Sequence, residues 1–416
     1  MTLPIPKLRI IIIGLGLIGP RHAQSVQSHP STEIIAFIDP SPSAREIGRE
    51  FNVPVYASLE ELLSASNPKG EQEGSGSGRD KPEPDAAIIC TPNHTHIPLT
   101  LDLLKRGIKN ILLEKPISDS LATTQPLLAA LKEREHKDAR ILVGHHRRFN
   151  PYTLSLKRVL DGGELGTILG VSGLWTLLKP ASYFKDIGKW RSQRGKGGVL
   201  GINLIHDIDL LQFLFGRIIR VYAEESAPQR SKQKQSGTGT ADENVNENEN
   251  ENEKEKHTAE EGVALTLRFE SGIIGTFLVN DCAPAPWNFE VGTGENPTVN
   301  GVLGEENGSR DCYRILGTGG SVSFPDLTVF KYDSVSSGGH ESIGKEAGWN
   351  IPLSATKIPV EGQEVKPFDT QWAHFVRVMQ GKEEVNCSVE DGVRALRVVG
   401  AIRESMESGR PVSIEA

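Results

Sequence analysis

The sequence predicts an α/β fold of two domains: a doubly wound parallel sheet, followed by an α+β domain with a large, mainly antiparallel open sheet. Over the first 145 residues, short apolar runs alternate with stretches of helical periodicity, which is the pattern of βαβ units. Beyond residue 146 the apolar segments are longer and strand-like, and the chain ends in helical periodicity. The length of 416 residues also favours two or three domains.

The first domain is expected to span residues 1–145, with strands and helices in alternation. Strands are expected at Leu8–Ile13, Glu33–Ile38, Asp85–Cys90, Asn110–Leu113 and Arg140–Val143. Helices are expected at Arg21–Ser28, from Ser58 onward, at Pro98–Lys105 and at Leu121–Arg134. Ser58 and Glu61 have the spacing of a capping box, and Gly107 is placed to end a helix.

The second domain is expected to span residues 146–416 and to combine one large sheet with helices. Strand-like segments are Thr167–Leu178, Ala264–Asn280, Gly319–Phe324 and Leu327–Tyr332. Helices are expected at Ile202–Phe215, Phe368–Met379 and Val389–Glu407, with Gly409 as a stop, so that C-terminal helices occupy 368–409.

Two segments, 67–84 and 227–262, interrupt the pattern. The first is rich in Gly, Ser, Lys and Glu, and the second contains an Asn-Glu alternation at 247–253. Neither has enough apolar residues to offset the entropy of ordering the chain, so we expect both to be disordered insertions.

Composition excludes several classes of function. A net charge of −8 and a pI of about 5.8 argue against a nucleic-acid partner. The longest apolar run, Ile10–Gly19, is too short for a membrane span. The four cysteines are scattered, with no CxxC pair and no histidine at metal-ligand spacing, so we expect no metal site and a reducing compartment. The N-terminus lacks the features of a signal peptide, which makes the cytoplasm the expected location.

A glycine-rich turn carries the strongest functional signal. Gly14-Leu15-Gly16-Leu17-Ile18-Gly19 fits GxGxxG and lies between a strand of consecutive isoleucines and a helix. In that position the glycines allow a tight turn, close approach of a pyrophosphate and close helix packing, and the helix N-terminus offers free N–H groups. Asp39 ends the next strand, where its carboxylate can accept ribose hydroxyls and repel a 2′-phosphate. The pattern predicts a Rossmann domain that binds NAD rather than NADP.

Four further islands contain chemically useful residues. They are Thr91-Pro92-Asn93-His94-Thr95-His96, Glu114-Lys115-Pro116, His145–Pro151 and Gly197–Asp209. The first three begin at the carboxyl ends of expected parallel strands, which is the edge where open α/β sheets bind ligands.

With these islands at these intervals, the chain resembles the glucose–fructose oxidoreductase / inositol dehydrogenase (Gfo/Idh/MocA) family over nearly its whole length, apart from the insertions. The resemblance implies a Rossmann domain joined to an α+β domain whose open sheet carries the substrate and often mediates oligomerisation. We therefore expect a homo-oligomer that transfers hydride between NAD(P) and a hydroxyl carbon of a sugar, polyol, inositol or cyclic hydroxy acid.

The resemblance also implies the roles of two residues. Lys115 matches the lysine of the family's EKP motif, which hydrogen-bonds the reacting hydroxyl and stabilises negative charge on its oxygen. His206 matches the family histidine that moves the hydroxyl proton. Inositol dehydrogenase-like members carry an Asp four residues before this histidine, but here that position is Ile202, followed by Asn203. The role of Asp209, one helical turn after His206, stays open.

The remaining site residues are expected to line the cofactor or the substrate. Glu114, Thr91, Pro92, Asn93 and His96 are expected on the cofactor side, and Arg148, Trp190, Arg191 and Asn203 on the substrate side. Lys189, Arg191 and Arg194 suit either an anionic substrate or a solvated surface, and Trp287 either closes the pocket or packs in the core. Two alternative functions remain open: a non-catalytic NAD-binding sensor and an NAD-dependent glycoside hydrolase.

Overall fold

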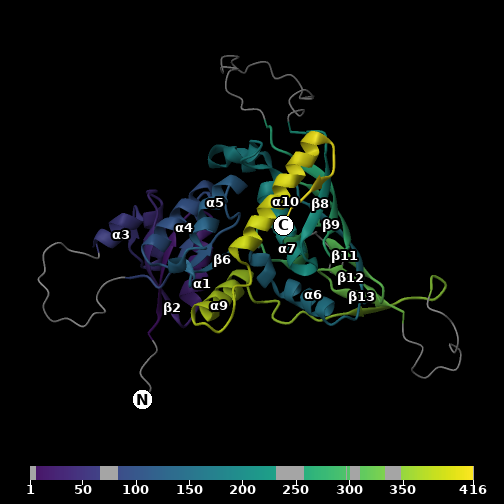
Figure 1. Ribbon diagram of the computed structural model, residues 1–416, viewed down its shortest axis with the longest axis horizontal. Coiled ribbons are helices and arrows are strands. Elements are labelled where there is room, and N and C mark those ends of the chain that lie inside the picture. Colours follow the sequence, from purple (N-terminus) through teal and green to yellow (C-terminus); the bar gives the residue numbers. More distant parts are fainter. Residues whose placement is uncertain are drawn as a thin grey trace, which may run out of the picture. The chain divides into compact units, whose positions relative to one another are not determined.

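The computed structural model describes residues 6–65, 83–230, 257–296, 298–299, 310–332 and 348–415 (Figure 1). The chain divides into a first unit, formed by residues 1–150 and 364–397, and a second unit, formed by 151–363 and 398–416. The division differs from the expected boundary at 145, because the chain between 364 and 397 returns to the first unit.

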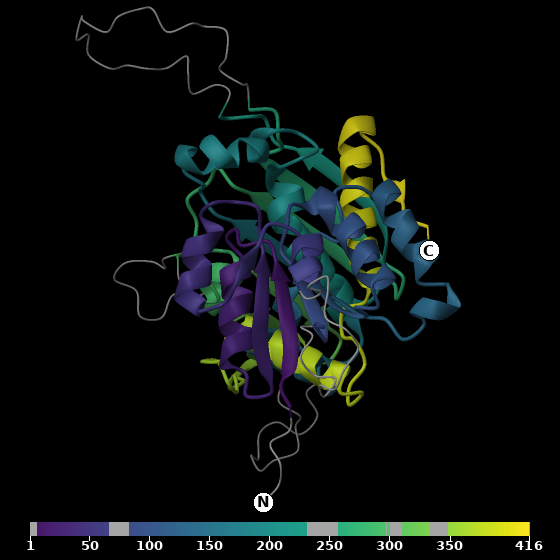
Figure 2. The same ribbon diagram turned by 90° about the vertical axis from the view of Figure 1, so that its left-hand side faces the viewer.

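The first unit is a parallel α/β domain. Its elements in chain order are β1 (Leu8–Ile13), α1 (Gly19–Ser28), β2 (Thr32–Ile38), α2 (Ala44–Phe51), β3 (Val55–Tyr56), α3 (Leu59–Ala65), β4 (Ala86–Ile89), η1 (Asn93–Thr95), α4 (His96–Lys105), β5 (Asn110–Leu113), α5 (Leu121–Ala130), η2 (Arg134–His136), β6 (Arg140–Val143), η3 (His146–Phe149) and α9 (Pro367–Met379). The sheet has the order β3-β2-β1-β4-β5-β6, which is the doubly wound order of a Rossmann fold. Figure 2 views its purple strands lying side by side.

Residues of β1 explain why this sheet must be covered on both faces. Ile10, Ile11 and Ile12 are completely buried and Ile13 nearly so. Successive strand side chains point to opposite faces, so an unbroken isoleucine run needs helices on each side. The expected strands Leu8–Ile13, Asn110–Leu113 and Arg140–Val143 have the bounds that the sequence predicted.

Helix α9 was expected in the second domain but belongs to the first unit. Its buried residues Trp372, Phe375 and Val376 are part of the same hydrophobic core as the parallel sheet. The backbone N–H of Val143, in β6, donates to the carbonyl of Cys387 at 2.9 Å. An amphipathic pattern predicts that one face of a helix is buried, but it does not indicate which sheet covers that face. Helix α10 (Val389–Ser408) begins in the first unit, and its last part belongs to the second.

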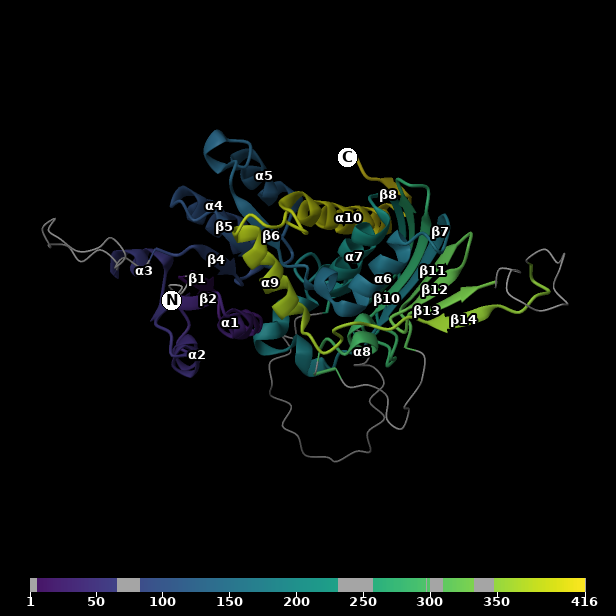
Figure 3. The ribbon, with the colours of Figure 1, turned by 90° about the horizontal axis from the view of Figure 1, so that it is seen from below.

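The second unit combines helices with a mixed, mostly antiparallel sheet. Its elements are α6 (Pro151–Asp161), β7 (Ile168–Thr176), η4 (Ala181–Phe184), η5 (Asp186–Ser192), the π-helical η6 (Leu200–Leu204), α7 (Ile205–Phe215), β8 (Ile218–Glu225), β9 (Gly262–Phe269), β10 (Ile274–Asn280), α8 (Phe289–Thr293), β11 (Tyr313–Gly317), β12 (Ser321–Phe324), β13 (Thr328–Lys331), β14 (Ser354–Lys357) and β15 (Val412–Ser413). The nine strands have the order β14-β13-β12-β11-β7-β10-β9-β8-β15, and among the pairs formed only β7 and β10 run parallel. Helices α6 and α7 lie on one face of this sheet (Figure 3).

The expected segment Ala264–Asn280 and the expected insertions differ in part from the structure. The expected segment Ala264–Asn280 is a hairpin of β9 and β10, turned at Gly272 with a φ of +94°. Of the expected insertions, residues 67–82 and 231–256 lie outside the described part of the chain. The ends of 227–262 nevertheless belong to the fold, because Glu260 and Glu261 are buried and β9 begins at Gly262.

Candidate functional site

The glycine turn after β1 has the shape that a bound pyrophosphate requires. A Cβ atom at Gly14 would lie 2.7 Å from the backbone of Cys90, and one at Gly19 would lie 2.2 Å from the carbonyl oxygen of Gly14. At Gly16, in contrast, no atom lies within 4 Å of the Cβ position. The outer two glycines therefore permit close packing, and Gly16 leaves open space where a dinucleotide can approach the backbone. Leu15 is buried, Ile18 is half-buried and the side chain of Leu17 is exposed.

Asp39 is fixed beside this turn. Its Oδ2 accepts the backbone N–H of Leu15 at 2.7 Å, and its Oδ1 accepts the N–H of Ser41 at 2.8 Å. The half-buried carboxylate retains further lone pairs. The turn and Asp39 thus fit the pyrophosphate and the ribose of NAD, and the negative charge opposes a 2′-phosphate.

The loop after β4 is tied to the loop after β5. His96, at the start of α4, is buried, with Nε2 at 2.8 Å from the carbonyl oxygen of Thr91 and Nδ1 at 2.9 Å from that of Pro116. Thr91 also hydrogen-bonds Thr95 at 2.6 Å. The histidine that was expected to line the cofactor is therefore held inside the fold, whereas Pro92 is exposed and Asn93 half-buried.

Lys115 lies directly after Glu114 at the carboxyl end of β5. Its side chain is half-buried, and Pro116 follows it through a cis peptide bond. Glu114 is buried, and a Cβ atom at Gly144, after the neighbouring β6, would lie 2.9 Å from its carboxylate. Strands β1, β4 and β5 are parallel, so Lys115 stands on the same sheet edge as the glycine turn.

Arg148 differs from the expectation that it contacts substrate. The side chain is 4% exposed, and its Nη1 donates to the carbonyl oxygen of Asn386 at 2.6 Å and lies 3.4 Å from Oδ2 of Asp391. Burial alone would raise the pKa of Asp391, but the positive charges of Arg148 and Arg394 and the hydrogen bond from the backbone N–H of Ser388 together outweigh it, and the pKa is lowered. The guanidinium thus joins η3 to the segment before α10 within the first unit.

In the second unit, Asn203 and His206 lie about one turn apart where η6 continues into α7. His206 is 8% exposed and Asn203 is half-buried. A π-helical turn of this kind is common at functional sites. The preceding Gly197 has no room for a side chain, because a Cβ atom there would lie 2.3 Å from the carbonyl oxygen of Arg191. Asp209, whose role was open, is buried.

The basic residues before this helix have different environments. Arg194 is paired with Glu225, at 2.5 and 2.7 Å. Arg191 donates to the carbonyl oxygen of Tyr183 at 3.0 Å, and its guanidinium lies over the rings of Tyr183 and Trp190 at 4.3 and 5.5 Å. Lys189 is exposed. Arg194 is thus neutralised by a neighbouring carboxylate, whereas Arg191 stands against aromatic faces.

One residue of this region, Lys179, was missed at the level of sequence. It follows the apolar Leu177 and Leu178 at the end of the β7 segment, is 8% exposed and donates from Nζ to Oδ1 of Asn203. A lysine that ends an apolar strand was the available signal, but its partner lies in another element.

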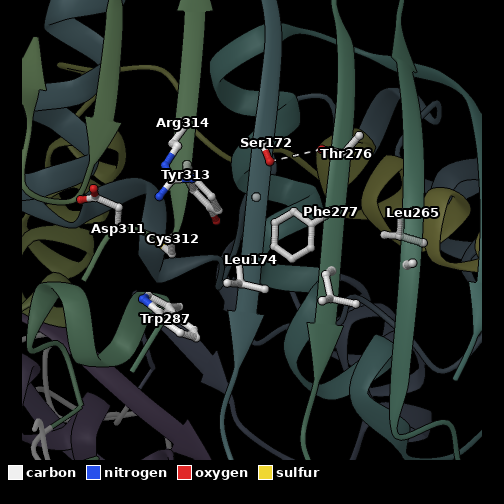
Figure 4. A pocket seen from close by; sticks show the side chains of 13 residues that line it. Ser172, Leu174, Leu265, Thr276, Phe277, Trp287, Asp311, Cys312, Tyr313 and Arg314 are labelled. Carbon is white, nitrogen blue, oxygen red and sulfur yellow. Dashed lines mark hydrogen bonds between the residues drawn. The ribbon is translucent and has the colours of Figure 1, made fainter. Parts of the chain in front are cut away.

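A cavity of about 620 Å³ lies on the sheet of the second unit, lined by side chains from β7, β9, β10 and β11 (Figure 4). Ser172 and Thr276 hydrogen-bond across neighbouring strands there at 3.2 Å. Both are exposed, and they alternate along their strands with the buried Gly173 and Phe277. Trp287 also lines the cavity and is 45% exposed, so it is not a core residue.

Two features are absent from the described ranges of the chain. No group of three or more His, Cys, Asp and Glu side chains in them is arranged to hold a metal ion. No helix in the same ranges is both long and apolar enough to cross a bilayer.

Comparisons with known proteins agree with this architecture. A model described as "Oxidoreductase family, NAD-binding Rossmann fold" matches residues 8–71 and 75–145, and one described as "Oxidoreductase family, C-terminal alpha/beta domain" matches 157–414. An inositol 2-dehydrogenase of Rhizobium meliloti is 28% identical over 212 residues, which cover 50% of this chain and 55% of that protein. The uncharacterized oxidoreductase YrbE of Bacillus subtilis is 24% identical over 97% of this chain and 96% of its own length. The crystal structure of a myo-inositol 2-dehydrogenase from Lactobacillus plantarum superposes with a TM-score of 0.66 at 19% identity, covering 98% of this chain and all of that one.

Proposed function

Because the chain belongs to the Gfo/Idh/MocA family of NAD-dependent oxidoreductases, we propose that it transfers hydride between NAD and a hydroxyl-bearing carbon of a sugar, polyol, inositol or cyclic hydroxy acid. The observation that carries the proposal is the shared sheet edge of Lys115 and the glycine turn, since parallel strands present their carboxyl ends to one ligand.

The first unit supplies the cofactor site. The N-terminus of α1 and the open space at Gly16 would hold the pyrophosphate, and Asp39 would accept the ribose hydroxyls. Leu15, Leu17, Ile18, Thr91, Pro92 and Asn93 would line this site, with His96 and Glu114 supporting its loops from inside. NAD, when bound, supplies the acceptor for the hydride.

Lys115 and His206 would divide the work on the reacting hydroxyl. The Lys115 ammonium would donate a hydrogen bond to the hydroxyl oxygen and stabilise the negative charge that develops there during oxidation, an effect of a kind worth about 3 kcal/mol. His206 would accept the hydroxyl proton through a ring nitrogen and return it in the reverse reaction. Asn203, Trp190 and Arg191 would contact the rest of the substrate, whereas Arg148 would support the fold.

The test is a screen of polyols, inositols, aldonic acids and cyclic hydroxy acids with NAD, following the absorbance of the reduced cofactor. Lys115→Ala is expected to abolish turnover and leave NAD affinity nearly unchanged. Lys109→Ala is the matched control, because Lys109 precedes β5 at its opposite end and pairs with Asp138 at 2.7 Å. Turnover that survives Lys115→Ala would show that the assigned role of Lys115 is wrong.

The same screen separates the other two candidate functions. NAD binding without reduction by any compound would favour a sensor. Hydrolysis of an aryl glycoside that requires NAD but releases no reduced cofactor would favour a glycoside hydrolase.

We also propose that the chain forms a homo-oligomer through the sheet face that bears the cavity of Figure 4. Exposed apolar side chains occur on that face, where Ile274, Leu278, Leu316 and Trp287 are between 45% and 57% exposed. Large apolar side chains exposed on one sheet face suit burial against another subunit. The four cysteines are free thiols, which supports a reducing, cytoplasmic location.

A further inference from the structure

Lys179 lies in a polar cluster of the second unit, and the proposed reaction gives it no role. Its Nζ donates to Oδ1 of Asn203 and lies 3.9 Å from Oδ2 of Asp281. The ammonium also stands over the rings of Trp175 and Tyr183, at 5.6 and 4.6 Å. Ordering and burying a long charged side chain is costly, so a residue held in this way has a specific role.

The contact with Lys179 fixes the orientation of the Asn203 side chain. An ammonium has only donors, so the carboxamide must turn its oxygen toward Nζ. Both N–H groups of the amide are then left for a different partner. Asn203 is half-buried, and the structure gives its side chain no second hydrogen bond to a described residue.

Three cationic groups lie around Tyr183 and Phe184, and few carboxylates pair with them directly. Arg191 and Lys179 both lie against the Tyr183 ring, and Arg230 lies over the neighbouring Phe184 at 4.4 Å. Among the described residues, Asp281 is the only carboxylate within 4 Å of these three cationic groups. The guanidinium of Arg230 donates to Oδ1 of Asp281 at 2.5 Å and to the backbone carbonyl oxygen of Asp281 at 2.6 Å. One buried carboxylate therefore serves two cations, and Arg191 has none.

From these contacts we infer that Lys179 and Asn203 form a specificity pair beside His206, in which Lys179 holds the Asn203 amide so that its N–H groups recognise a carboxylate of the substrate. The inference rests on the proposed function and narrows its substrate class to hydroxy acids. Lys179 is a positioning residue in this scheme, and Asn203 makes the contact. Donated N–H groups, together with the nearby Arg191 guanidinium that pairs with no carboxylate in the described residues, favour an anion over a neutral hydroxyl at that position.

The pair makes the preference depend on pH. The pKa of Lys179 is lowered to about 8, chiefly by burial. The negative charges of Asp281 and Glu290 oppose this lowering, and the positive charges of Arg230 and Arg191 add to it. Asp281 and Tyr183 are the titratable groups nearest to Nζ, and burial raises the pKa of Tyr183. A neutral amine can accept as well as donate, so above about pH 8 Lys179 no longer forces one orientation of the amide. The preference for an acid should then decline.

The experiment compares matched pairs that differ only in carboxylate against hydroxymethyl: D-gluconate with D-glucitol, D-glucuronate with D-glucose, and L-tartrate with L-threitol. Binding to the NAD-loaded protein is measured by calorimetry, and kcat/KM by reduction of NAD. At pH 7 we expect the acid of at least one pair to be favoured roughly tenfold or more, as for a hydrogen bond to a charged group.

Three variants and a control test the roles of the two residues. Asn203→Asp places a carboxylate against the substrate acid and should reverse the preference while sparing the neutral partner. Lys179→Met should remove the preference, and Lys179→Arg should keep it and extend it above pH 8, because a guanidinium stays charged. Lys357→Met removes an exposed lysine of β14 and should change nothing.

The outcomes separate this inference from the proposed function. If Asn203→Asp and Lys179→Met reduce the affinity and kcat/KM for the acid and for its neutral partner equally, the pair is merely structural. A wild type that shows no preference for an acid would also overturn the inference. Acid-selective binding that Asn203→Asp reverses, without hydride transfer to NAD from any compound, would retain the specificity pair and reject the dehydrogenase.

Discussion

In the first unit, Nε2 of His22 lies 2.8 Å from Oε1 of Glu114, and Oε2 of Glu114 accepts the backbone N–H of Lys115 at 3.1 Å. His22 belongs to α1, which begins at the glycine turn, and Glu114 follows β5. Both side chains are almost completely buried. The pair therefore connects the helix of the cofactor site to the peptide group of the lysine proposed to act on the substrate.

Replacing His22 by alanine should destabilise the first unit. The carboxylate of Glu114 would stay buried without its imidazole partner, and breaking a buried pair in this way costs about 3 kcal/mol. Urea unfolding of His22→Ala against the wild type measures the change in the free energy of unfolding. His94→Ala, which removes an exposed histidine, is the control and should change stability little. Equal effects of the two substitutions would contradict the importance of the pair.

Glu114 should also contribute to the pH dependence of stability. Burial alone would raise its pKa, but the hydrogen bond from His22 and the charges of His22, Lys115 and His146 outweigh burial, and the pKa is lowered. A carboxyl whose pKa is lowered by folding stabilises the native state above its unfolded pKa of about 4.3 and loses that contribution as the pH falls. The free energy of unfolding of the wild type should thus fall more steeply below pH 5 than that of Glu114→Gln. Parallel curves for the two proteins would contradict the shift.

Asp39→Asn should change the choice of dinucleotide more than the fold. The amide oxygen can still accept one of the two backbone N–H groups that Asp39 now binds, but the negative charge that opposes a 2′-phosphate is lost. We expect the ratio of NADP to NAD affinity to rise roughly tenfold, because the substitution removes a charge that strengthens hydrogen bonds to the ribose of NAD and repels the 2′-phosphate of NADP. Fluorescence titration with each reduced cofactor measures the ratio. An unchanged ratio would mean that Asp39 does not contact the ribose.

Gly198→Ala should destabilise the second unit through Glu260. Gly198 has a φ of +86°, and a Cβ atom there would lie 2.3 Å from the buried Oε1 of Glu260. Gly195 has a similar φ of +84°, but nothing lies within 4 Å of its Cβ position. Gly195→Ala should therefore cost only the backbone strain of about 1 kcal/mol, and Gly198→Ala about 3 kcal/mol or more. Thermal unfolding of the two variants compares them, and similar midpoints would show that Glu260 can move aside.

Leu278→Arg tests the proposed subunit contact. Leu278 is 45% exposed on β10 and lines the cavity of Figure 4, so an arginine there is accommodated in a monomer but not in an apolar interface. Sedimentation velocity should show a smaller species than the wild type. Lys357→Arg, on the edge strand β14, should leave the sedimentation coefficient unchanged. A wild type that is already monomeric would reject the contact.

Local pattern was sufficient for the glycine turn and for several strands of the parallel sheet. A short unbroken run of β-branched isoleucines favours a strand buried on both faces, and glycines at 14, 16 and 19 between that strand and a helix fit the turn of a dinucleotide site. The capping spacing of Ser58 is confirmed as well, since its Oγ accepts the N–H of Glu61 at 3.1 Å. These features depend on residues within a few positions of each other. Sequence therefore identified the nucleotide turn, the strands beside it and the family.

Tertiary structure decided which side chains use each other. Arg148 was expected at the substrate, but it contacts Asp391, which is 243 positions away in the sequence. The role proposed for Lys179 follows only from its hydrogen bond to Asn203, which is 24 positions away in another element. Helix α9 likewise has an apolar face that its sequence displays, yet only the fold places that face in the core of the parallel sheet. The periodicity of apolar residues predicts which side chains are buried, and the charge of a side chain indicates the kind of group with which it can pair. The partner itself is set by chain topology, because the residues that meet come from separate elements.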